Sequence, residues 1–334
     1  MHNNCEKKSD NNFRDLLKPR QTQRAFFHDY RDPCIYMFTL RKSQGIPVFS
    51  NVAGNPKIVS APDAPHIELT DTGCIVGAEI LRTAGMRADY LDIYSYMIMP
   101  DHVHLLLRVK KRLDKPVTKI IGIIESAITS ICCKSGIILP NQSVFERNCI
   151  HDRILTKAGQ LDILKRYIAD NPRRYLVKKL YPDLFRRYLS ITLGEKRFDS
   201  VGNIFLLSKL LFPVHVRRRW TQLEKDAYRE VCLQMVLADH VMISPFIHPL
   251  EREIMKDALD AGGFIIKITE RGFAERWKPE GKWFDLCAAG RYLVIAESGS
   301  PDIRRDMNYQ IASHMNELAA YIAALPKGGF MSGI

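Results

Sequence analysis

Runs of hydrophobic residues predict three strands in the first third of the chain. Residues 34–40 are rich in strand-forming side chains and follow the breaker Pro33. Two more such runs, residues 90–99 and 102–109, lie close together with only a short polar break between them. We therefore expect two consecutive strands there.

Hydrophobic residues recur at helical spacing in three segments of the same region. Helices are predicted over residues 72–85, 115–134 and 161–170. The third should end at Asn171, because Pro172 disfavours helical conformation at the residue before it. Strands and helices in this order predict a compact α+β fold with an antiparallel sheet.

The pattern changes after about residue 200, where predicted helices alternate with fully apolar strands. The helices are expected over residues 222–237 and 249–260, and the strands over residues 240–244, 263–269 and 292–297. Such alternation is typical of a parallel α/β unit. The chain is thus predicted to have three parts: a basic tail over residues 1–30, an α+β domain over 31–190 and a smaller α/β domain over 200–325.

Composition favours a polyanionic partner without identifying it. The chain has 49 Lys and Arg against 37 Asp and Glu, a formal net charge of +12. Residues 165–187 hold eight basic side chains and two acidic ones. This cluster fits a DNA-binding surface, although a solvated helix face would look the same.

The cysteines and the hydropathy indicate a cytoplasmic protein. The eight cysteines form no CxxC pair, which argues against a zinc ribbon or a disulfide framework. No apolar run approaches the roughly 20 residues that span a bilayer. The first ten residues are polar and lack the apolar core of a secretory signal, so no membrane association is expected.

Two histidines two residues apart are the first candidate for chemistry. Side chains alternate between the faces of a strand, so His102 and His104 should emerge on one face, about 6.5 to 7 Å apart at the backbone. Val103, Leu105 and Leu107 would fill the other face. The pair could bind one metal ion, but two structural histidines would show the same spacing.

Tyr167 and Asn171 are the second candidate. They are four residues apart in a predicted helix, so the phenol and the amide can project from one face, one turn apart. If this helix packs over the strand that carries the histidines, Tyr167 would supply a nucleophile. The amide oxygen of Asn171 would then be the third ligand of the metal ion, after the two imidazoles. The alternative is that Tyr167 is a packing residue and Asn171 a helix stop.

Three motifs together resemble a known family. Residues 99–107 (MPDHVHLLL), 145–148 (FERN) and 167–172 (YIADNP) are similar, in order and spacing, to those of the HUH-type single-tyrosine transposases. The similarity is greatest to the REP-associated tyrosine transposase branch, and it extends over roughly residues 30–180. This chain departs from the family in a more basic segment after Asn171 and a longer loop over residues 51–65.

The resemblance implies a fold and a set of site residues. The fold would be a ferredoxin-like palm with an antiparallel sheet, as in HUH endonucleases, followed by the smaller Rossmann-like domain. Tyr167 would be the nucleophile, and His102, His104 and Asn171 the ligands of Mg²⁺ or Mn²⁺. The arginines expected to contact DNA are Arg147, Arg166, Arg173 and Arg174.

The implied activity is that of a DNA transposase, a metal-dependent endonuclease and strand transferase acting on single-stranded DNA. Attack of the tyrosine on phosphorus would form a 5′-phosphotyrosine and release a 3′-hydroxyl, without any need for ATP. The expected substrate is a single strand with a hairpin or repeat, and the protein could act as a homodimer.

The second half resembles the Rossmann-like domain of the DNA-processing protein A family over about 110 residues. The segments that carry this likeness are residues 240–249, 261–263 and 272–287. No GxGxxG motif is present, so dinucleotide binding is not supported. We expect an accessory domain that assists DNA binding or dimerisation.

Two other functions remain open from the sequence. One is a domesticated DNA-binding regulator, derived from a transposase, that no longer cuts. The other is a metal-dependent hydrolase that uses only His102 and His104, and that would leave Tyr167 without a role.

Overall fold

The computed structural model describes residues 28–58, 61–146, 151–274, 277–303 and 306–326. The chain forms two compact units, Met1–Leu176 and Val177–Ile334, and each is described by itself. The division falls before the expected boundary between residues 190 and 200. Most of the predicted tail lies outside the described residues.

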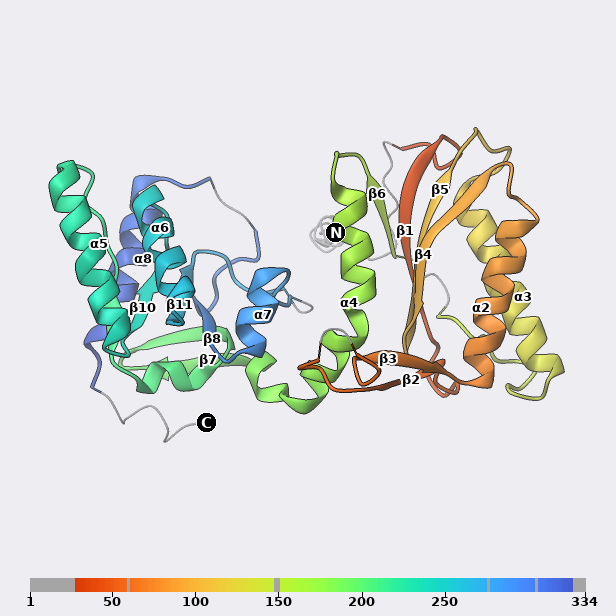
Figure 1. The fold of residues 1–334 in the computed structure, drawn as a ribbon, viewed down its shortest axis with the longest axis horizontal. Helices are drawn as coiled ribbons and strands as arrows, with labels where there is room; N and C mark the ends of the chain where they lie inside the picture. The colour runs from red at the N-terminus through yellow and green to blue at the C-terminus, as the bar shows by residue number, and fades with distance from the viewer. Residues whose placement is uncertain (1–27, 59–60, 147–150, 275–276, 304–305, 327–334) are drawn as a thin grey trace, which may run out of the picture. The chain divides into compact units, whose positions relative to one another are not determined.

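The first unit is a four-stranded antiparallel sheet with helices on both faces (Figure 1). The sheet order is β4-β5-β1-β6, and the chain runs β1-α2-β4-β5-α3-β6, which is the split βαβ arrangement of ferredoxin-like folds. The elements are β1 (Cys34–Arg41), β2 (Ser50–Ala53), β3 (His66–Leu69), α2 (Asp71–Gly85), β4 (Leu91–Ile98), β5 (His102–Val109), α3 (Val117–Lys134), β6 (His151–Leu155) and α4 (Gln160–Leu180). The predicted α+β fold with an antiparallel sheet is confirmed.

The two faces of this sheet bury different cores. Val103, Leu105 and Leu107 of β5 belong to the larger core, together with buried residues of α2 and α3. On the opposite face, a smaller core joins Met37 and Leu106 of the sheet to α4. Helix α4 therefore covers the face on which the histidines were predicted to lie.

Helix α4 corrects one prediction, because it does not end at Asn171. It continues through Pro172 to Leu180. Proline has no N–H to donate to the carbonyl of Ile168, but Nδ2 of Asn171 donates to that carbonyl at 3.4 Å. Burial of residues on both sides of Pro172 also stabilises the helix, so packing overrides the local preference.

The second unit is built on a six-stranded mixed sheet of order β7-β8-β12-β11-β10-β9. Strands β9 to β12 are parallel to one another, whereas β8 pairs antiparallel with both β12 and β7. The elements are η1 (Pro182–Phe185), β7 (Arg187–Leu193), β8 (Lys196–Gly202), η2 (Ile204–Ser208), β9 (Leu211–Pro213), α5 (Gln222–Leu237), β10 (Val241–Ser244), α6 (Pro249–Asp260), β11 (Phe264–Thr269), α7 (Lys282–Ala288), β12 (Tyr292–Glu297) and α8 (Tyr309–Ala324). The β7–β8 hairpin, β9, α7 and α8 were not predicted.

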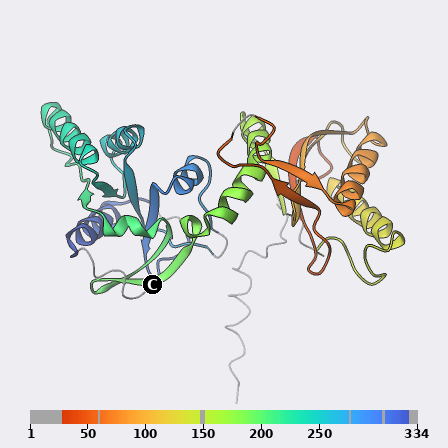
Figure 2. The same ribbon diagram turned by 60° about the horizontal axis from the view of Figure 1, so that its bottom comes forward.

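Helices cover both faces of this second sheet. One core joins the sheet to α5, α6 and α7, and another joins its opposite face to α8. Helices α5 and α6 lie side by side (Figures 1 and 2). The parallel strands follow one another in chain order, without the reversal at which doubly wound folds bind ligands, so a Rossmann-like assignment is not confirmed.

No helix in the described part of the chain combines the length and hydrophobicity that crossing a bilayer requires.

A carboxyl group in α3 makes the stability of the first unit depend on pH. Glu125 is half-buried, and its carboxyl group forms no hydrogen bond or ion pair within the described residues; burial raises its pKa to about 7. The unfolded carboxyl titrates near 4.3, so the folded state binds the proton more tightly. Stability should therefore fall as pH rises from about 4.5 to above 7.

We predict that Glu125→Gln removes this dependence, since the amide stays neutral. At pH 8 the variant should be more stable than the wild type, by roughly 3 kcal/mol at most, and at pH 4.5 nearly equal to it. Denaturant unfolding at the two pH values measures the difference, with the exposed Glu68→Gln as control. Parallel pH profiles of wild type and Glu125→Gln would contradict the prediction.

Candidate active site

The histidine pair converges on one point above the sheet. His102 and His104 lie on β5, an interior strand of the first sheet. Their Nε2 atoms are 3.2 Å apart, and their ring centroids are 4.6 Å apart at an interplanar angle of 73°. His104 is buried and His102 is half-buried. The shared face predicted from the sequence is thus present.

Each imidazole is oriented through its other nitrogen. His102 Nδ1 lies 2.7 Å from Asp101 Oδ1, and His104 Nδ1 lies 2.9 Å from Thr39 Oγ1. The hydrogen bond from His102 lowers the pKa of Asp101, which stays a carboxylate and can only accept. His102 Nδ1 therefore carries the hydrogen, and its Nε2 presents a lone pair toward His104 when the ring is neutral.

This geometry fits a site in which both imidazoles bind the same metal ion. Two imidazole nitrogens about 2.1 Å from one ion lie roughly 3 Å apart when the angle at the ion is between a right angle and a tetrahedral one. Hydrogen-bonded partners on the remote nitrogens are typical of metal-binding histidines. Within the described residues, however, no group of three or more His, Cys, Asp and Glu side chains could hold an ion. Among the described residues, a third ligand would have to be of another type.

Helix α4 places Tyr167 beside this pair. The centroid of its ring is 5.7 Å from that of His104, at an angle of 60°. Leu164 and Ile168 on the same helix are buried against Met37 and Leu106 of the sheet, and Tyr167 packs at the margin of this core. The structure thus brings the predicted nucleophile and the two histidines together.

Asn171 lies one helical turn beyond Tyr167 and is buried. Because its Nδ2 donates to the carbonyl of Ile168, the amide oxygen is the atom that could coordinate an ion. Its role as a ligand remains a prediction. The sequence interpretation as a helix stop is wrong, since the helix continues.

The predicted DNA-contacting arginines have different environments. Arg166 is exposed, whereas Arg173 donates two hydrogen bonds to Asp170, at 2.6 and 2.9 Å. Arg174 is buried, and its guanidinium carbon is 5.6 Å from the centroid of the Tyr167 ring. Arg147 lies outside the described residues. Arg174 is therefore placed to act on the tyrosine rather than on a distant phosphate.

Two residues of the site were missed by sequence reasoning. Asp101 directly precedes His102, so a search for carboxylates beside the histidines would have found it. Thr39 could not have been found in this way, because it meets His104 only through the pairing of β1 with β5.

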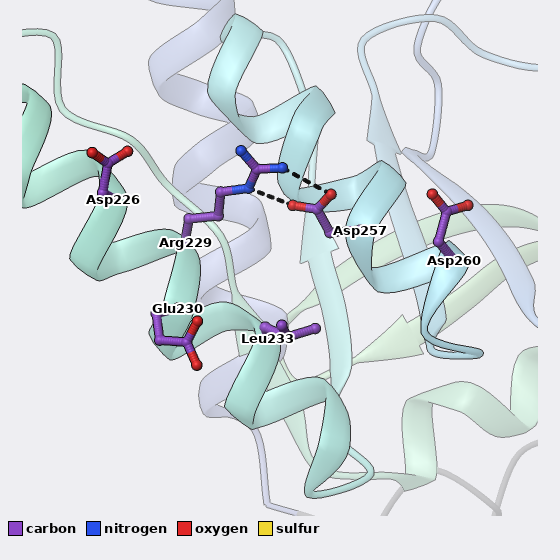
Figure 3. A pocket seen from close by; sticks show the side chains of 6 residues that line it. All are labelled: Asp226, Arg229, Glu230, Leu233, Asp257 and Asp260. Carbon is purple, nitrogen blue, oxygen red and sulfur yellow. Dashed lines mark hydrogen bonds and ion pairs between the residues drawn. The ribbon is translucent and has the colours of Figure 1, made fainter.

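A separate groove in the second unit is lined by Asp226, Arg229, Glu230, Leu233, Asp257 and Asp260 (Figure 3). It has a volume of about 400 Å³ and lies on α5 and α6. Arg229 bridges the two helices through hydrogen bonds of 2.5 and 2.9 Å to Asp257. Its acidic lining is unsuited to DNA.

The similarity of this chain to known proteins does not identify its family. No family model and no curated protein matches the chain. Among solved structures, it is similar to one described as a REP-associated tyrosine transposase bound to a REP hairpin, with 12% identity and a TM-score of 0.33. The match covers 46% of this chain and 74% of the other.

We predict that Asn171→Ala destabilises the first unit. The substitution leaves the carbonyl of Ile168 without a donor, because Pro172 cannot supply one, and the expected cost is about 1 kcal/mol. Denaturant unfolding should show this loss, and the exposed Asn141→Ala serves as control. Equal stability of Asn171→Ala and the wild type would show that the side-chain bond does not support the helix.

Proposed function

We propose that the first unit is a metal-dependent endonuclease and strand transferase for single-stranded DNA, with Tyr167 as nucleophile. The proposal is supported by one juxtaposition: the phenol ring of Tyr167 lies against His104, whose Nε2 is 3.2 Å from that of His102. A phenol can act as nucleophile in transfer of a phosphodiester, two convergent imidazoles can bind a metal ion, and a buried guanidinium can offset the phosphate charge.

The reaction exchanges one phosphate ester bond for another. The phenol oxygen of Tyr167 attacks phosphorus, and the bond from phosphorus to the 3′-oxygen breaks. The phenol loses its proton to solvent, and the leaving 3′-oxygen gains one. The product is a 5′-phosphotyrosine with a free 3′-hydroxyl, and attack by a 3′-hydroxyl on the adduct transfers the strand without ATP.

His102, His104 and the oxygen of Asn171 would hold Mg²⁺ or Mn²⁺. When bound, the ion would polarise the scissile phosphate and neutralise developing charge. Imidazole ligands favour manganese and related ions, whereas magnesium prefers oxygen ligands. Asp101 and Thr39 keep both rings oriented, so the nitrogens are arranged before any ion binds.

Arg174 would assist the nucleophile. A phenol with a pKa near 10 is largely protonated at neutral pH. The guanidinium, whose carbon lies 5.6 Å from the ring centroid and which also pairs with Asp170, would attract the phosphate that the oxygen attacks.

We expect Tyr167→Phe to abolish the covalent adduct while leaving DNA affinity nearly unchanged. The variant loses only the attacking oxygen and keeps the ring. Denaturing gels of labelled single-stranded DNA detect the adduct, and Tyr175→Phe on the same helix is the matched control. An adduct that persists in Tyr167→Phe would eliminate Tyr167 as nucleophile. If the wild type binds DNA but forms no adduct, the non-cleaving regulator becomes the better description.

Removal of the ion should stop cleavage. EDTA, His102→Ala and His104→Ala are each expected to reduce cleavage by about 100-fold or more, and added Mn²⁺ should rescue only the chelated wild type. Calorimetric titration with Mn²⁺ provides a separate measure of binding, with the exposed His66→Ala as control. Full activity in EDTA would exclude a metal from the reaction.

Single strands should be cleaved in preference to duplexes. The phenol oxygen must come within about 3 to 3.5 Å of phosphorus and in line with the leaving oxygen, which requires a backbone that can bend into the site. The same sequence, offered as single strand, hairpin and perfect duplex at two salt concentrations, tests this. Binding should weaken steeply with salt. Equal cutting of the duplex would show that the substrate class is wrong.

A further inference from the structure

A lysine lies inside the second unit near the carboxyl edge of its parallel strands. Lys267 is in β11, between β10 and β12. Its neighbours Ile266 and Ile268 pack on the side of α8, so Lys267 projects to the other face, which α5, α6 and α7 cover.

Among the residues that the structure describes, no acidic side chain is in hydrogen-bonding contact with Lys267. Its side chain is half-buried, and its ammonium donates no hydrogen bond and forms no ion pair within that part of the chain. The ammonium lies 5.3 Å from the centroid of the Trp283 ring. Burial lowers its pKa; Glu270 opposes this, and Lys282 and Arg252 reinforce it. A partly desolvated cation among other cations destabilises the fold unless an anion compensates it.

Two of these cations, Lys267 and Lys282, lie against one aromatic ring. The ammonium of Lys282 is 4.8 Å from the centroid of the same Trp283 ring. That ring packs on Tyr292 of β12, with a centroid separation of 4.7 Å, which fixes its position. Two ammonium groups are therefore held at one rigid indole.

The neighbouring loop, between β10 and α6, has a strained backbone. Phe246 has a φ of 53°, in the region that favours glycine. It is held there because its N–H donates to Ser244 Oγ at 3.0 Å, and because Arg252 donates to the carbonyls of Phe246 and Ile247. Ser244 is the register partner of Lys267. Strain of this kind clusters at ligand sites.

We propose that Lys267, Lys282 and Arg252 form a site for the terminal phosphate of a small ligand, with Trp283 as its apolar wall. Lysine binds phosphate as a point charge. A phosphate monoester carries close to two negative charges at neutral pH and offsets three cations better than a phosphodiester, which carries one. The site belongs to the second unit alone and does not depend on the function proposed for Tyr167.

Calorimetric titration of the full chain with adenosine 5′-monophosphate and with inorganic phosphate tests the site. Saturable binding should weaken about tenfold or more in Lys267→Met and in the exposed variant Lys282→Met. It should stay within about twofold of the wild type in Lys256→Met, an exposed control on α6. Absence of saturable binding of both probes, or undiminished binding by Lys267→Met, would overturn the proposal.

Thermal unfolding shows whether a variant that binds weakly is still folded. Without ligand, Lys267→Met should melt at or above the wild-type temperature, because a half-buried charge is replaced by an apolar side chain of similar length. With adenosine 5′-monophosphate, only the wild type and Lys256→Met should gain stability. A gain of equal size in Lys267→Met would contradict the assignment.

Oligonucleotides with and without a 5′-phosphate separate a terminal phosphate from the DNA backbone. If Lys267→Met weakens binding of the phosphorylated strand alone, the terminal phosphate is the ligand group. If it weakens binding of both strands equally, the site holds phosphodiesters and the proposal is wrong.

Discussion

The candidate active site depends on the packing of helix α4 across the histidine-bearing face of the first sheet. Leu164 and Ile168 are one turn apart and bury their side chains against Met37 and Leu106. This contact sets the rotation of the helix and leaves Tyr167 facing His104. Without this contact, nothing would hold the phenol on α4 close to the imidazoles on β5, and they could not act on one substrate.

The same helix has to continue beyond its proline for the site to be complete. Arg174, which lies over the Tyr167 ring, is two residues past Pro172. Asn171 makes this possible by donating to the carbonyl that proline leaves without a partner. One side chain would thus support the helix with its nitrogen and, in the proposed function, bind an ion with its oxygen.

The two units differ in how their buried or half-buried polar side chains are stabilised. In the first, both imidazoles are oriented by hydrogen bonds, so two nitrogens converge at little further entropic cost. In the second, Lys267 lies beside other cations and has no hydrogen-bonded acid among the described residues, an arrangement that burial makes costly. Arrangements of the second kind persist where function compensates for the lost stability.

The sequence by itself determined the local features. Alternation along residues 102–109 correctly separated the histidine face from the apolar face of β5. Helices α5 and α6 were predicted with the bounds that the structure shows, and capping boxes at Thr221 and His248 define where each begins.

Only the tertiary structure decided the features that depend on distant partners. These include the contact of Thr39 with His104, the passage of α4 through Pro172 and the position of Lys267 against Trp283. Periodicity records which face of an element is buried, but not which element buries it. The register of β1 on β5 and the packing of α4 are set by contacts between residues far apart in the chain, and no local pattern encodes them.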